Sequence, residues 1–246
     1  MIIIEPEIFN VFPEIKCGFS TKTDPEALPP YYFNLSASVG DDPAAVMARK
    51  ERFYNWFGIT SSDVATQYQV HEDTITYVTK PGLSPSSDVL VTDVTGLGLV
   101  VSSADCLPVF IYDKKNHVIA GIHSGWKSSE KRIVRKALEF LQDKWNSHPD
   151  DLYIYFGPSI SGEVYEVGPE VAQKFPSKYL IPKKEKFLLN IPLFNLDILT
   201  SFGIPDKNIQ VSRLCSYSSK KLLHSYRRDG QVSGRAVGMI LMKEKN

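Results

Sequence analysis

Two neighbouring segments decide the fold: SSADCLPVFIYD (Ser102–Asp113) and AGIHSGWK (Ala120–Lys127). Each contains an apolar run of the length and composition typical of a buried strand. The residues Asp113–Asn116 between them are typical of a tight turn, so the sequence predicts a β-hairpin. This hairpin would bring Cys106, before one strand, close to His123, at the end of the other.

The rest of the chain contains more predicted strands than helices. Strands are predicted at 67–78, 88–92, 97–103, 107–113, 117–122, 152–156, 209–214 and 235–242. Because they cluster more than they alternate with helices, we expect mixed or antiparallel sheets with helices packed outside. The predicted fold class is α/β, with α+β character. Residues 1–246 would form a single domain of layered mixed β-sheets flanked by helices.

Two long helices and two shorter ones are expected. The first covers DDPAAVMARKERFYNWFG, with Asp42 as N-cap, Pro43 in the first turn and Gly58 at the exit. The second covers SSEKRIVRKALEFLQDKW, with Ser128 or Ser129 as its cap. Its apolar stripe consists of Ile133, Ala137, Leu138, Leu141 and Trp145. The shorter helices are expected after Pro169 and at 194–202, the latter closed by Gly203.

Composition limits the classes of partner and the compartment. The formal net charge is zero, from 28 basic and 28 acidic residues, so no global field favours nucleic acid or an anionic membrane. Three cysteines far apart in sequence do not suggest a disulfide framework. Neither a signal peptide nor an apolar run of about 18 residues is recognisable. We therefore expect a cytoplasmic protein with no nucleic-acid or membrane partner; its oligomeric state is not predictable.

The most informative candidate site combines His71, Cys106 and His123. Their separations do not fit a zinc finger or ribbon, which excludes a small structural zinc module. One thiol and two imidazoles at strand ends suit a catalytic zinc with one open coordination position. Such a zinc makes a usable hydroxide at neutral pH. From spacing alone, the alternative is that these are unrelated core or surface residues.

A second reading of the same residues needs no metal. Cys106 would be a nucleophile and His123 its base, as in a Cys–His hydrolase. Asp105 or Asp88 could then orient the imidazole. In this reading His71 is incidental.

Other segments offer candidate substrate contacts. Arg227 and Arg228 in SYRRDG could bind a phosphate or carboxylate bidentately, or could be solvated surface residues. The small-residue segment FGPSISGEVYEVG (Phe156–Gly168) could form the wall of a pocket or serve only as a connection. Trp126 and Lys127 next to His123 could contact substrate, with packing as the alternative for the tryptophan.

Taken together, the motifs resemble the YfiH family, also called laccase-domain or multicopper polyphenol oxidase proteins. The resemblance runs from GFSTK (Gly18–Lys22) to SGR (Ser233–Arg235). In between, in family order, are FNLSASVGDDP, QVHED, SSDVLVTD, ADCLPVFIYD, AGIHSGWK, FGPSISGEVYEVG, CSYSS and HSYRRDGQVSGR. Any one of these is weak evidence, whereas the ordered set is very specific.

The resemblance implies an activity and a cofactor. His71, Cys106 and His123 would bind a catalytic Zn²⁺, with copper as the possible alternative. The implied reactions are phosphorolysis of adenosine, inosine, guanosine and methylthioadenosine, and hydrolytic deamination of adenosine. The substrates would be purine nucleosides and phosphate, with Lys127, Arg227 and Arg228 as candidate substrate-binding residues. The implied fold is a single α/β domain with layered mixed sheets.

Three positions depart from the family pattern. Lys127-Ser128 stands where the family usually has Arg-Gly, Arg49-Lys50 where it has Asn-Arg, and His224 where Phe or Tyr is common. These departures concern positions where substrate or phosphate contacts would be expected. The rival activity, a copper-dependent polyphenol oxidase, would need many histidine ligands. The chain has five: His71, His117, His123, His148 and His224.

Overall fold

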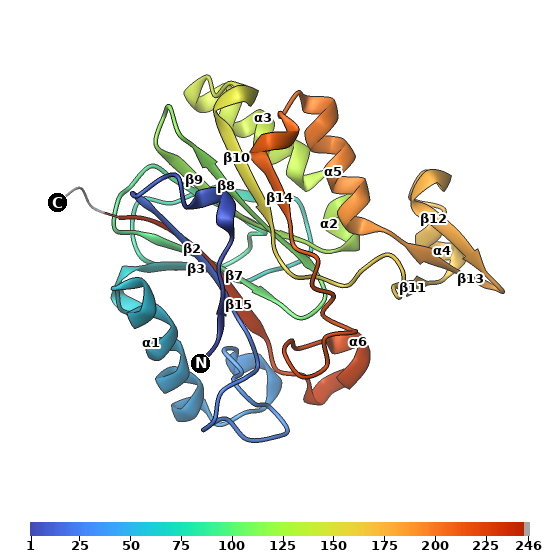
Figure 1. Ribbon diagram of the computed structural model, residues 1–246, viewed down its shortest axis with the longest axis horizontal. Coiled ribbons are helices and arrows are strands. Elements are labelled where there is room, and N and C mark those ends of the chain that lie inside the picture. Colours follow the sequence, from blue (N-terminus) through green and yellow to red (C-terminus); the bar gives the residue numbers. More distant parts are fainter. Residues whose placement is uncertain (244–246) are drawn as a thin grey trace.

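The computed structural model describes residues 1–243 and shows two six-stranded sheets packed face to face (Figure 1). The first sheet has the order β1-β2-β15-β7-β3-β5, and the second has the order β14-β10-β8-β9-β6-β4. Both sheets mix parallel and antiparallel pairs; for example, β3 runs parallel to β7, whereas β15 runs antiparallel to it. The predicted fold class, with layered mixed sheets, is therefore confirmed.

The elements have the following bounds. The strands are β1 (Ile3–Ile4), β2 (Ile15–Ser20), β3 (Val64–Gln67), β4 (Ile75–Tyr77), β5 (Gly82–Ser84), β6 (Val89–Thr92), β7 (Gly98–Ser103), β8 (Leu107–Asp113), β9 (Val118–Ser124), β10 (Leu152–Phe156), β11 (Glu166–Val167), β12 (Leu180–Lys183), β13 (Lys186–Leu189), β14 (Ile209–Val211) and β15 (Ala236–Met242). The helices are α1 (Pro43–Phe57), α2 (Trp126–Glu130), α3 (Ile133–Trp145), α4 (Pro169–Ala172), α5 (Ile191–Phe202) and α6 (Tyr226–Asp229).

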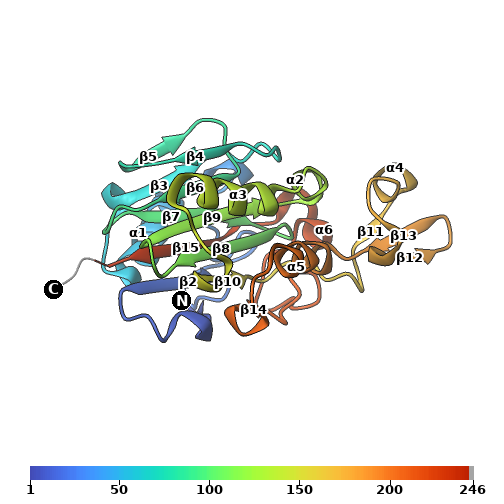
Figure 2. The ribbon, with the colours of Figure 1, turned by 90° about the horizontal axis from the view of Figure 1, so that it is seen from above.

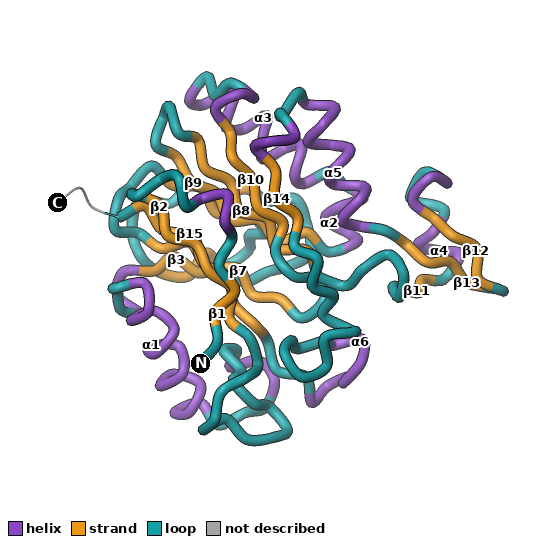
Figure 3. Tube along the Cα trace, viewed as in Figure 1, coloured by secondary structure: helices purple, strands orange, loops and turns teal. Residues whose placement is uncertain are grey.

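Helices cover the outer face of each sheet, which gives four layers (Figures 1 and 2). Helix α1 packs Phe53 and Phe57 on the first sheet, while α3 and α5 pack on the second. Between the sheets lies a third apolar layer that includes Leu99, Phe110 and Tyr112. A small sheet of order β11-β13-β12 projects from this sandwich with α4 (Figure 3). Among the residues described, no helix is long and apolar enough to cross a bilayer.

The hairpin that the sequence predicts is present. Strands β8 and β9 pair antiparallel along their whole length, and Asp113 Oδ1 accepts the backbone N–H groups of Lys115 and Asn116 in the turn. The two strands are buried at every position. Since full burial favours continuous apolar runs over alternation, these strands were recognisable without a period-2 pattern.

Helix α1 also follows its prediction. Asp42 accepts hydrogen bonds from the backbone N–H groups of Ala44 and Ala45, and Gly58 ends the helix with a left-handed φ of 88°. Helix α5 ends at Gly203 as predicted, but it begins earlier, at Ile191. Asn190 caps that start, which the apolar pattern alone did not reveal.

Two predicted elements are wrong. The strand predicted at 67–78 is β3 and β4, which belong to different sheets and are joined by the loop that carries His71. The helix predicted from Ser128 to Trp145 is broken at Arg132, whose φ of 59° is left-handed. As a result, Ser128 and Ser129 are buried inside α2 and cap nothing. Apolar periodicity detects such segments but not breaks made by single backbone residues.

Candidate metal centre

The three metal-capable residues lie on two connections and one strand end. Cys106 lies in the turn between β7 and β8, His123 near the end of β9, and His71 in the loop between β3 and β4. In the hairpin, Pro108 is paired with His123, so Cys106 comes beside the segment that follows His123. The ligand atoms of the three residues all lie within 4.8 Å of one another. The structure therefore brings together the set that the sequence singled out.

The set is open to solvent on one side. Cys106 Sγ lies 4.0 Å from His71 Nε2, and the two imidazole rings have centroids 4.8 Å apart at an angle of 82°. His123 is buried, Cys106 is partly buried, and His71 is exposed. A ligand could thus approach the centre from the side of His71.

Asp88, which is fully buried, organises two of the three residues. Its Oδ1 lies 2.7 Å from His123 Nδ1 and accepts that N–H, which leaves Nε2 free to act as a ligand. The same carboxylate accepts the backbone N–H groups of Val70, His71 and Glu72, at 3.2, 3.1 and 2.9 Å. One carboxylate therefore fixes the tautomer of His123 and the shape of the loop that presents His71.

Gly125 leaves room for the centre. A Cβ at this position would lie 3.0 Å from Cys106 Sγ and 3.1 Å from His71 Cδ2. A side chain here would press on two of the three ligand residues at once. The glycine of the HSGWK motif is thus required by the close approach of the ligands, rather than by its backbone angles.

The buried thiol and imidazole stabilise each other's charged forms. Burial alone would raise the pKa of Cys106, but the charge and hydrogen bonds of His123 and His71 lower it to about 6. Burial alone would lower the pKa of His123, but the Cys106 thiolate and Asp88 raise it to about 9. Without a metal, the centre therefore holds a thiolate–imidazolium pair at neutral pH.

This pairing can be measured directly. In metal-free protein we expect the ultraviolet absorbance of the Cys106 thiolate to appear with a pKa of about 6, so that the thiol is ionised at pH 7. The measurement is the difference in absorbance between wild type and Cys106→Ser across a pH titration. A transition near the ordinary thiol value of 9.0 would contradict the pairing.

The donor set fits zinc. Zinc binds thiolate and imidazole ligands, and catalytic sites combine three protein ligands with a position for water or substrate. Here one thiolate and two imidazoles converge, and Asp88 supplies the outer hydrogen bond that metal-bound histidines usually make. Imidazole also suits copper, so the donor atoms alone do not exclude it.

Asp105, next to Cys106, has a different role from Asp88. Its carboxylate accepts the Ser216 hydroxyl and the Arg227 backbone N–H, both at 2.6 Å, and burial raises its pKa. Its backbone has a left-handed φ of 108°, which is strained for a residue with a side chain. Asp105 therefore joins the turn of Cys106 to the C-terminal segment, and of the two aspartates only Asp88 orients His123.

Arg227 lies at the edge of the centre. Its backbone N–H is held by Asp105, its Nη1 donates to the carbonyl of Glu166 at 2.5 Å, and its guanidinium lies 5.1 Å from the Tyr165 ring centroid. The residue is exposed, and among residues 1–243 the Glu166 carbonyl is the only hydrogen-bond acceptor of its guanidinium, so its other N–H groups can meet a ligand. Its position is compatible with the substrate-binding role considered for it.

Arg228 points into the protein instead. Its Nη1 donates to the carbonyls of Ser216 and Tyr217, and its Nη2 donates to that of Leu223. Its Nε and Nη2 also bond to the carboxylate of Asp229. Because its donors are engaged in this way, Arg228 holds the C-terminal loop and has no donor left for a phosphate.

Lys127 follows the centre on α2 and is exposed. Its Nζ lies 5.7 Å from the ring centroid of Trp126, the residue before it. Trp126 itself is partly buried and packs against the core on the outer face of the second sheet. The lysine can therefore reach solvent near the metal ligands while the tryptophan packs.

A pocket opens directly beside Cys106. It is small and is lined by Asp105, Cys106, Leu107, Ser124, Gly125, Trp126, Ser159, Ile160, Tyr165 and Ile191. Three of these residues belong to the segment 156–168. This segment thus forms a pocket wall, the first of the two roles considered for it.

Arg235, at the end of the SGR motif, was missed as a candidate. It directly precedes β15, where Ala236 pairs with Ser103, so Arg235 lies across from Ala104 and beside the turn of Cys106. Burial lowers the pKa of Arg235, whereas the negative charges of Asp105 and Cys106 raise it. Its motif was noticed in the sequence, but nothing local showed that pairing with β7 would bring it to the centre.

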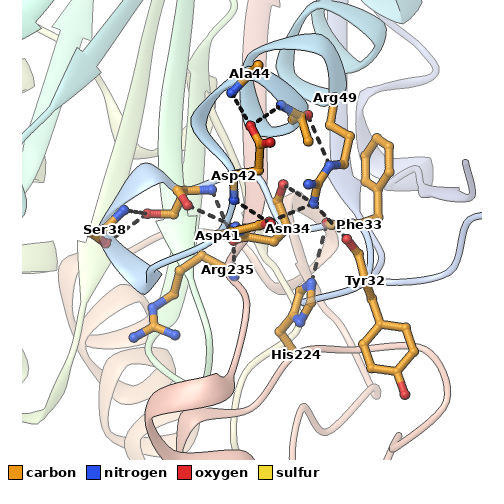
Figure 4. Close-up of polar contacts among 12 residues, drawn as sticks. Tyr32, Phe33, Asn34, Ser38, Asp41, Asp42, Ala44, Arg49, His224 and Arg235 are labelled. Atoms are coloured by element: carbon orange, nitrogen blue, oxygen red, sulfur yellow. Dashed lines mark hydrogen bonds and ion pairs between the residues drawn. The ribbon is translucent and has the colours of Figure 1, made fainter. Parts of the chain in front are cut away.

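A hydrogen-bond network fixes the backbone around Arg235 (Figure 4). Asn34 Oδ1 accepts the backbone N–H of Arg235 at 2.9 Å, and Asn34 Nδ2 donates to Asp41. Arg49 donates to Asp41 and to the carbonyls of Tyr32 and Asn34. In Figure 4 the Arg235 side chain points away from this network, so its guanidinium is not used there.

Arg49 and His224, which belong to the departures from the family pattern, both make hydrogen bonds within the fold. Arg49 belongs to the network around Arg235, and His224, which is buried, makes a 3.3 Å contact from Nε2 to the carbonyl of Phe33. Burial lowers the pKa of His224 to about 4, so it is neutral at pH 7. The third departure leaves the Ser128 hydroxyl buried without a hydrogen-bond partner in the described chain.

Comparison with known proteins identifies the family. The family model described as multi-copper polyphenol oxidoreductase laccase matches residues 16–243. The chain therefore belongs to this family, which confirms the resemblance drawn from its motifs.

The relatives add two kinds of likeness. A protein of Bacteroides thetaiotaomicron named purine nucleoside phosphorylase is 30% identical over 228 residues, covering 85% of this chain and 84% of the relative. Purine nucleoside phosphorylase YlmD of Bacillus subtilis is 29% identical over 249 residues, covering 94% and 90%. The crystal structure of the Bacillus licheniformis hypothetical protein YfiH matches with a TM-score of 0.90 at 27% identity, covering 98% of this chain and 96% of that one.

Proposed function

We propose that this chain is a zinc-dependent purine nucleoside phosphorylase that also deaminates adenosine. The substrates would be adenosine, inosine, guanosine and methylthioadenosine, each cleaved with phosphate. Relatives that match over most of their length carry the name purine nucleoside phosphorylase. The observation that carries the proposal is the convergence of His71, Cys106 and His123, held by Asp88 and open to solvent.

Phosphorolysis requires that the protein bind phosphate and stabilise the departing base. The bond from C1′ of the ribose to N9 of the base breaks, its electron pair leaves with the base, and a phosphate oxygen bonds to C1′. The protein must therefore hold an anion and stabilise the departing base. Arg235, Arg227 and Lys127 are cations near the centre. Within residues 1–243, Arg235 Nη1 donates to the carbonyls of Ser233 and Gly234 and Arg227 Nη1 to that of Glu166, and the donors that remain would hold the phosphate. Zinc, when bound, supplies Lewis acidity and activates water at neutral pH, which deamination requires.

The copper-oxidase alternative has less support from the site. Within residues 1–243, His71, Cys106 and His123 are the only group of three or more potential metal ligands close enough to share one ion. The other histidines have separate surroundings: His117 contacts Tyr112, His148 starts a short helical turn, and His224 is buried against Phe33. The described chain thus offers one ion site and no second copper centre.

The metal-free alternative draws on the same geometry. Asp88, His123 and Cys106 stand in the order of a Cys–His–Asp hydrolase, and the thiol is ionised at neutral pH. Against it stands His71, which a nucleophilic cysteine would not need at 4.0 Å. The two readings make opposite predictions about activity after removal of metal.

The test is a chromatographic assay of zinc-loaded protein with adenosine, inosine and methylthioadenosine, with and without phosphate. We expect free base and ribose 1-phosphate (methylthioribose 1-phosphate from methylthioadenosine) only when phosphate is present. Adenosine should also give inosine without phosphate, and chelation should suppress both reactions. Copper-loaded protein with a phenol substrate is the rival arm. Phenol oxidation without nucleoside turnover would overturn the proposal in favour of the oxidase, and hydrolysis that survives chelation would favour the Cys–His reading.

The anion site gives a prediction of its own. Arg235→Gln, Arg227→Gln or Lys127→Gln should raise the KM for phosphate by about tenfold or more, because each removes a charge-assisted hydrogen bond worth about 1.5–3 kcal/mol. The KM for nucleoside should change less. Arg213→Gln, at an exposed position without such neighbours, is the matched control. If none of the three variants shifts the phosphate KM relative to this control, these residues do not form the anion site.

A further inference from the structure

The loop that carries His71 is held at its surface by ion pairs to the segment of α2 and α3. Glu72 pairs with Lys131, and Asp73 pairs with Lys136. Lys131 Nζ also lies 3.9 Å from Asp73 Oδ1, so this lysine contacts both carboxylates. We call these four side chains the surface ion-pair cluster. The cluster joins the loop to the outer helices, whereas the buried carboxylate described above holds the loop through its backbone.

His71 gives the loop a conformation that needs support. Its backbone is left-handed, with a φ of 60°, and this region costs free energy for any residue that has a side chain. Such residues persist in folded proteins where their surroundings hold them in place. His71 is exposed, so core packing does not supply that support. The contacts of the neighbouring residues must therefore keep the imidazole at the centre.

The helix side of the cluster is anchored beside His123. Ser129 Oγ on α2 lies 2.8 Å from Ser124 Oγ, and Asn195 on α5 donates to Ser129 Oγ at 3.1 Å. Ser124 directly follows His123 and is the last residue of β9. Because these hydroxyl and amide groups are buried, a shift of α2 would break hydrogen bonds inside the protein. Helix α2 is thus a fixed support for Lys131, which follows it.

The break between α2 and α3 lets both lysines reach the same carboxylate. In one continuous helix, the side chains of residues 131 and 136 would point about 140° apart around the axis. The chain instead turns at Arg132, whose φ of 59° is left-handed, and α3 begins at the next residue. Lys131 and Lys136 both contact Asp73 across this turn. The interruption that apolar periodicity did not reveal thus shapes one side of the ion-pair cluster.

We propose that the surface ion-pair cluster is a second route, besides Asp88, that holds the imidazole of His71 in position relative to His123 and so raises the affinity of the centre for zinc. The inference rests on the proposed function, which supplies the ion. None of the four side chains belongs to the group of ligand atoms that, in the described chain, lie close enough to share an ion. They are therefore positioning residues. Because they are between 30% and 48% exposed, salt screens their attraction, and their contribution to zinc affinity falls as ionic strength rises.

Lys131→Met combined with Lys136→Met keeps the apolar stems and removes both charges. At low ionic strength we expect the dissociation constant for zinc, measured by competition with a chromogenic chelator, to rise about fivefold. At about 1 M salt, where screening acts over about 3 Å, wild type and variant should bind zinc equally. Arg135→Met is the matched control, because it breaks an exposed ion pair with Glu139 on α3 that does not involve the loop. Its zinc affinity should equal that of wild type at both salt concentrations.

The sign of this effect separates positioning from direct repulsion between the lysines and the ion. Removing two positive charges near a cation site would by itself tighten zinc binding, whereas loss of the cluster weakens it. Exchange of the charges provides a rescue. Lys131→Glu alone should weaken zinc binding, and adding Glu72→Lys should restore part of the affinity, because the pair forms again with its charges reversed. Tighter or unchanged binding in the double methionine variant, or no rescue by the exchanged pair, would overturn the inference.

Hydrogen exchange of the metal-free protein tests the cluster without any ion. The backbone N–H groups of His71 and Glu72 bond to Asp88, and they should exchange about fivefold faster in the double methionine variant. The N–H groups of β9 should exchange at the wild-type rate. Faster exchange in a chain that binds no zinc would remove the proposed function while keeping the role of the cluster in the loop. Equal exchange in wild type and variant would show that the loop does not depend on the cluster, which overturns the inference.

Discussion

Cys106→Ala is expected to lose bound zinc and nucleoside turnover together. The thiolate is the one negatively charged ligand of the set, and neither alanine nor serine replaces its charge. Zinc contributes several kcal/mol to transition-state stabilisation, so kcat/KM should fall by about a thousandfold or more. The measurements are elemental analysis of the purified variant and the phosphorolysis assay under identical zinc loading.

The other two cysteines provide controls for this variant. Cys17 is buried in the layer between the sheets, and Cys215 is partly buried, with its Sγ accepting the Ser161 N–H at 3.4 Å. Cys215→Ser and Cys17→Ala should keep zinc content and turnover near wild type. If Cys106→Ala retains both zinc and rate, the metal assignment is wrong. If it retains zinc but loses rate, the thiol acts as a nucleophile rather than as a ligand.

Asp88→Asn should cause the second-largest loss of zinc binding. Asp88 contacts His123 at Nδ1 and not at Nε2, the nitrogen that would bind zinc. The amide keeps the shape of the carboxylate but has only one acceptor oxygen for the four donors now bound. The tautomer of His123 and the loop of His71 would both be released, so we expect zinc affinity to fall about 10–100-fold. The free energy of unfolding should fall by at least ~2 kcal/mol, because hydrogen bonds to a buried charge are lost.

The pH dependence of this loss has a definite sign. Burial would raise the pKa of Asp88, but His123 and the loop N–H groups lower it below its ordinary value of 3.8. Its stabilising contribution is therefore full above that value and is lost as pH falls towards the lower, folded-state pKa. The difference in unfolding free energy between wild type and Asp88→Asn should narrow below pH 3.8, measured by denaturant titration of metal-free protein. Asp143→Asn, an exposed aspartate on α3, should show no such difference. A constant gap across this range would mean that Asp88 acts without its charge.

Much of the fold was accessible from sequence because its central strands are continuous apolar runs with recognisable turns. The β8–β9 hairpin and helix α1 depend on local signals, such as the Asp113 turn and the Asp42 cap, and both were predicted closely. The breaks were not predicted: the one at Arg132 is the left-handed backbone of a single residue, and the one at His71 depends on a tertiary contact. The loop at His71 forms around a carboxylate seventeen positions later, and nothing local to residues 67–78 reveals it. That residues 1–246 form one domain stays a prediction.

Some residues of the candidate site were likewise recognisable from sequence, whereas others were not. The metal-capable residues were recognisable because their chemistry is rare in this chain: five histidines and three cysteines leave few combinations. Arginines are common, and chemistry alone could not separate Arg228, whose five donors are all engaged, from Arg235, whose Nη1 bonds to two neighbouring carbonyls and whose backbone lies beside the turn of Cys106. Only the pairing of β15 with β7 distinguishes them.

The positions of the three candidate ligands in the fold have a consequence for unfolding. His71 and Cys106 lie on two of the three connections through which the chain crosses from the first sheet to the second, β3–β4 and β7–β8, and His123 lies on the second sheet itself. An ion bound to all three would join these two crossings to one strand of the second sheet, so it would oppose separation of the two layers while it stayed bound. Occupancy would then add directly to the free energy of unfolding, by about 2.7 kcal/mol when free zinc is at 100 times its dissociation constant. The cofactor of the proposed reaction would at the same time be a cross-link between the layers, and zinc starvation would lower the protein's resistance to unfolding as well as its activity.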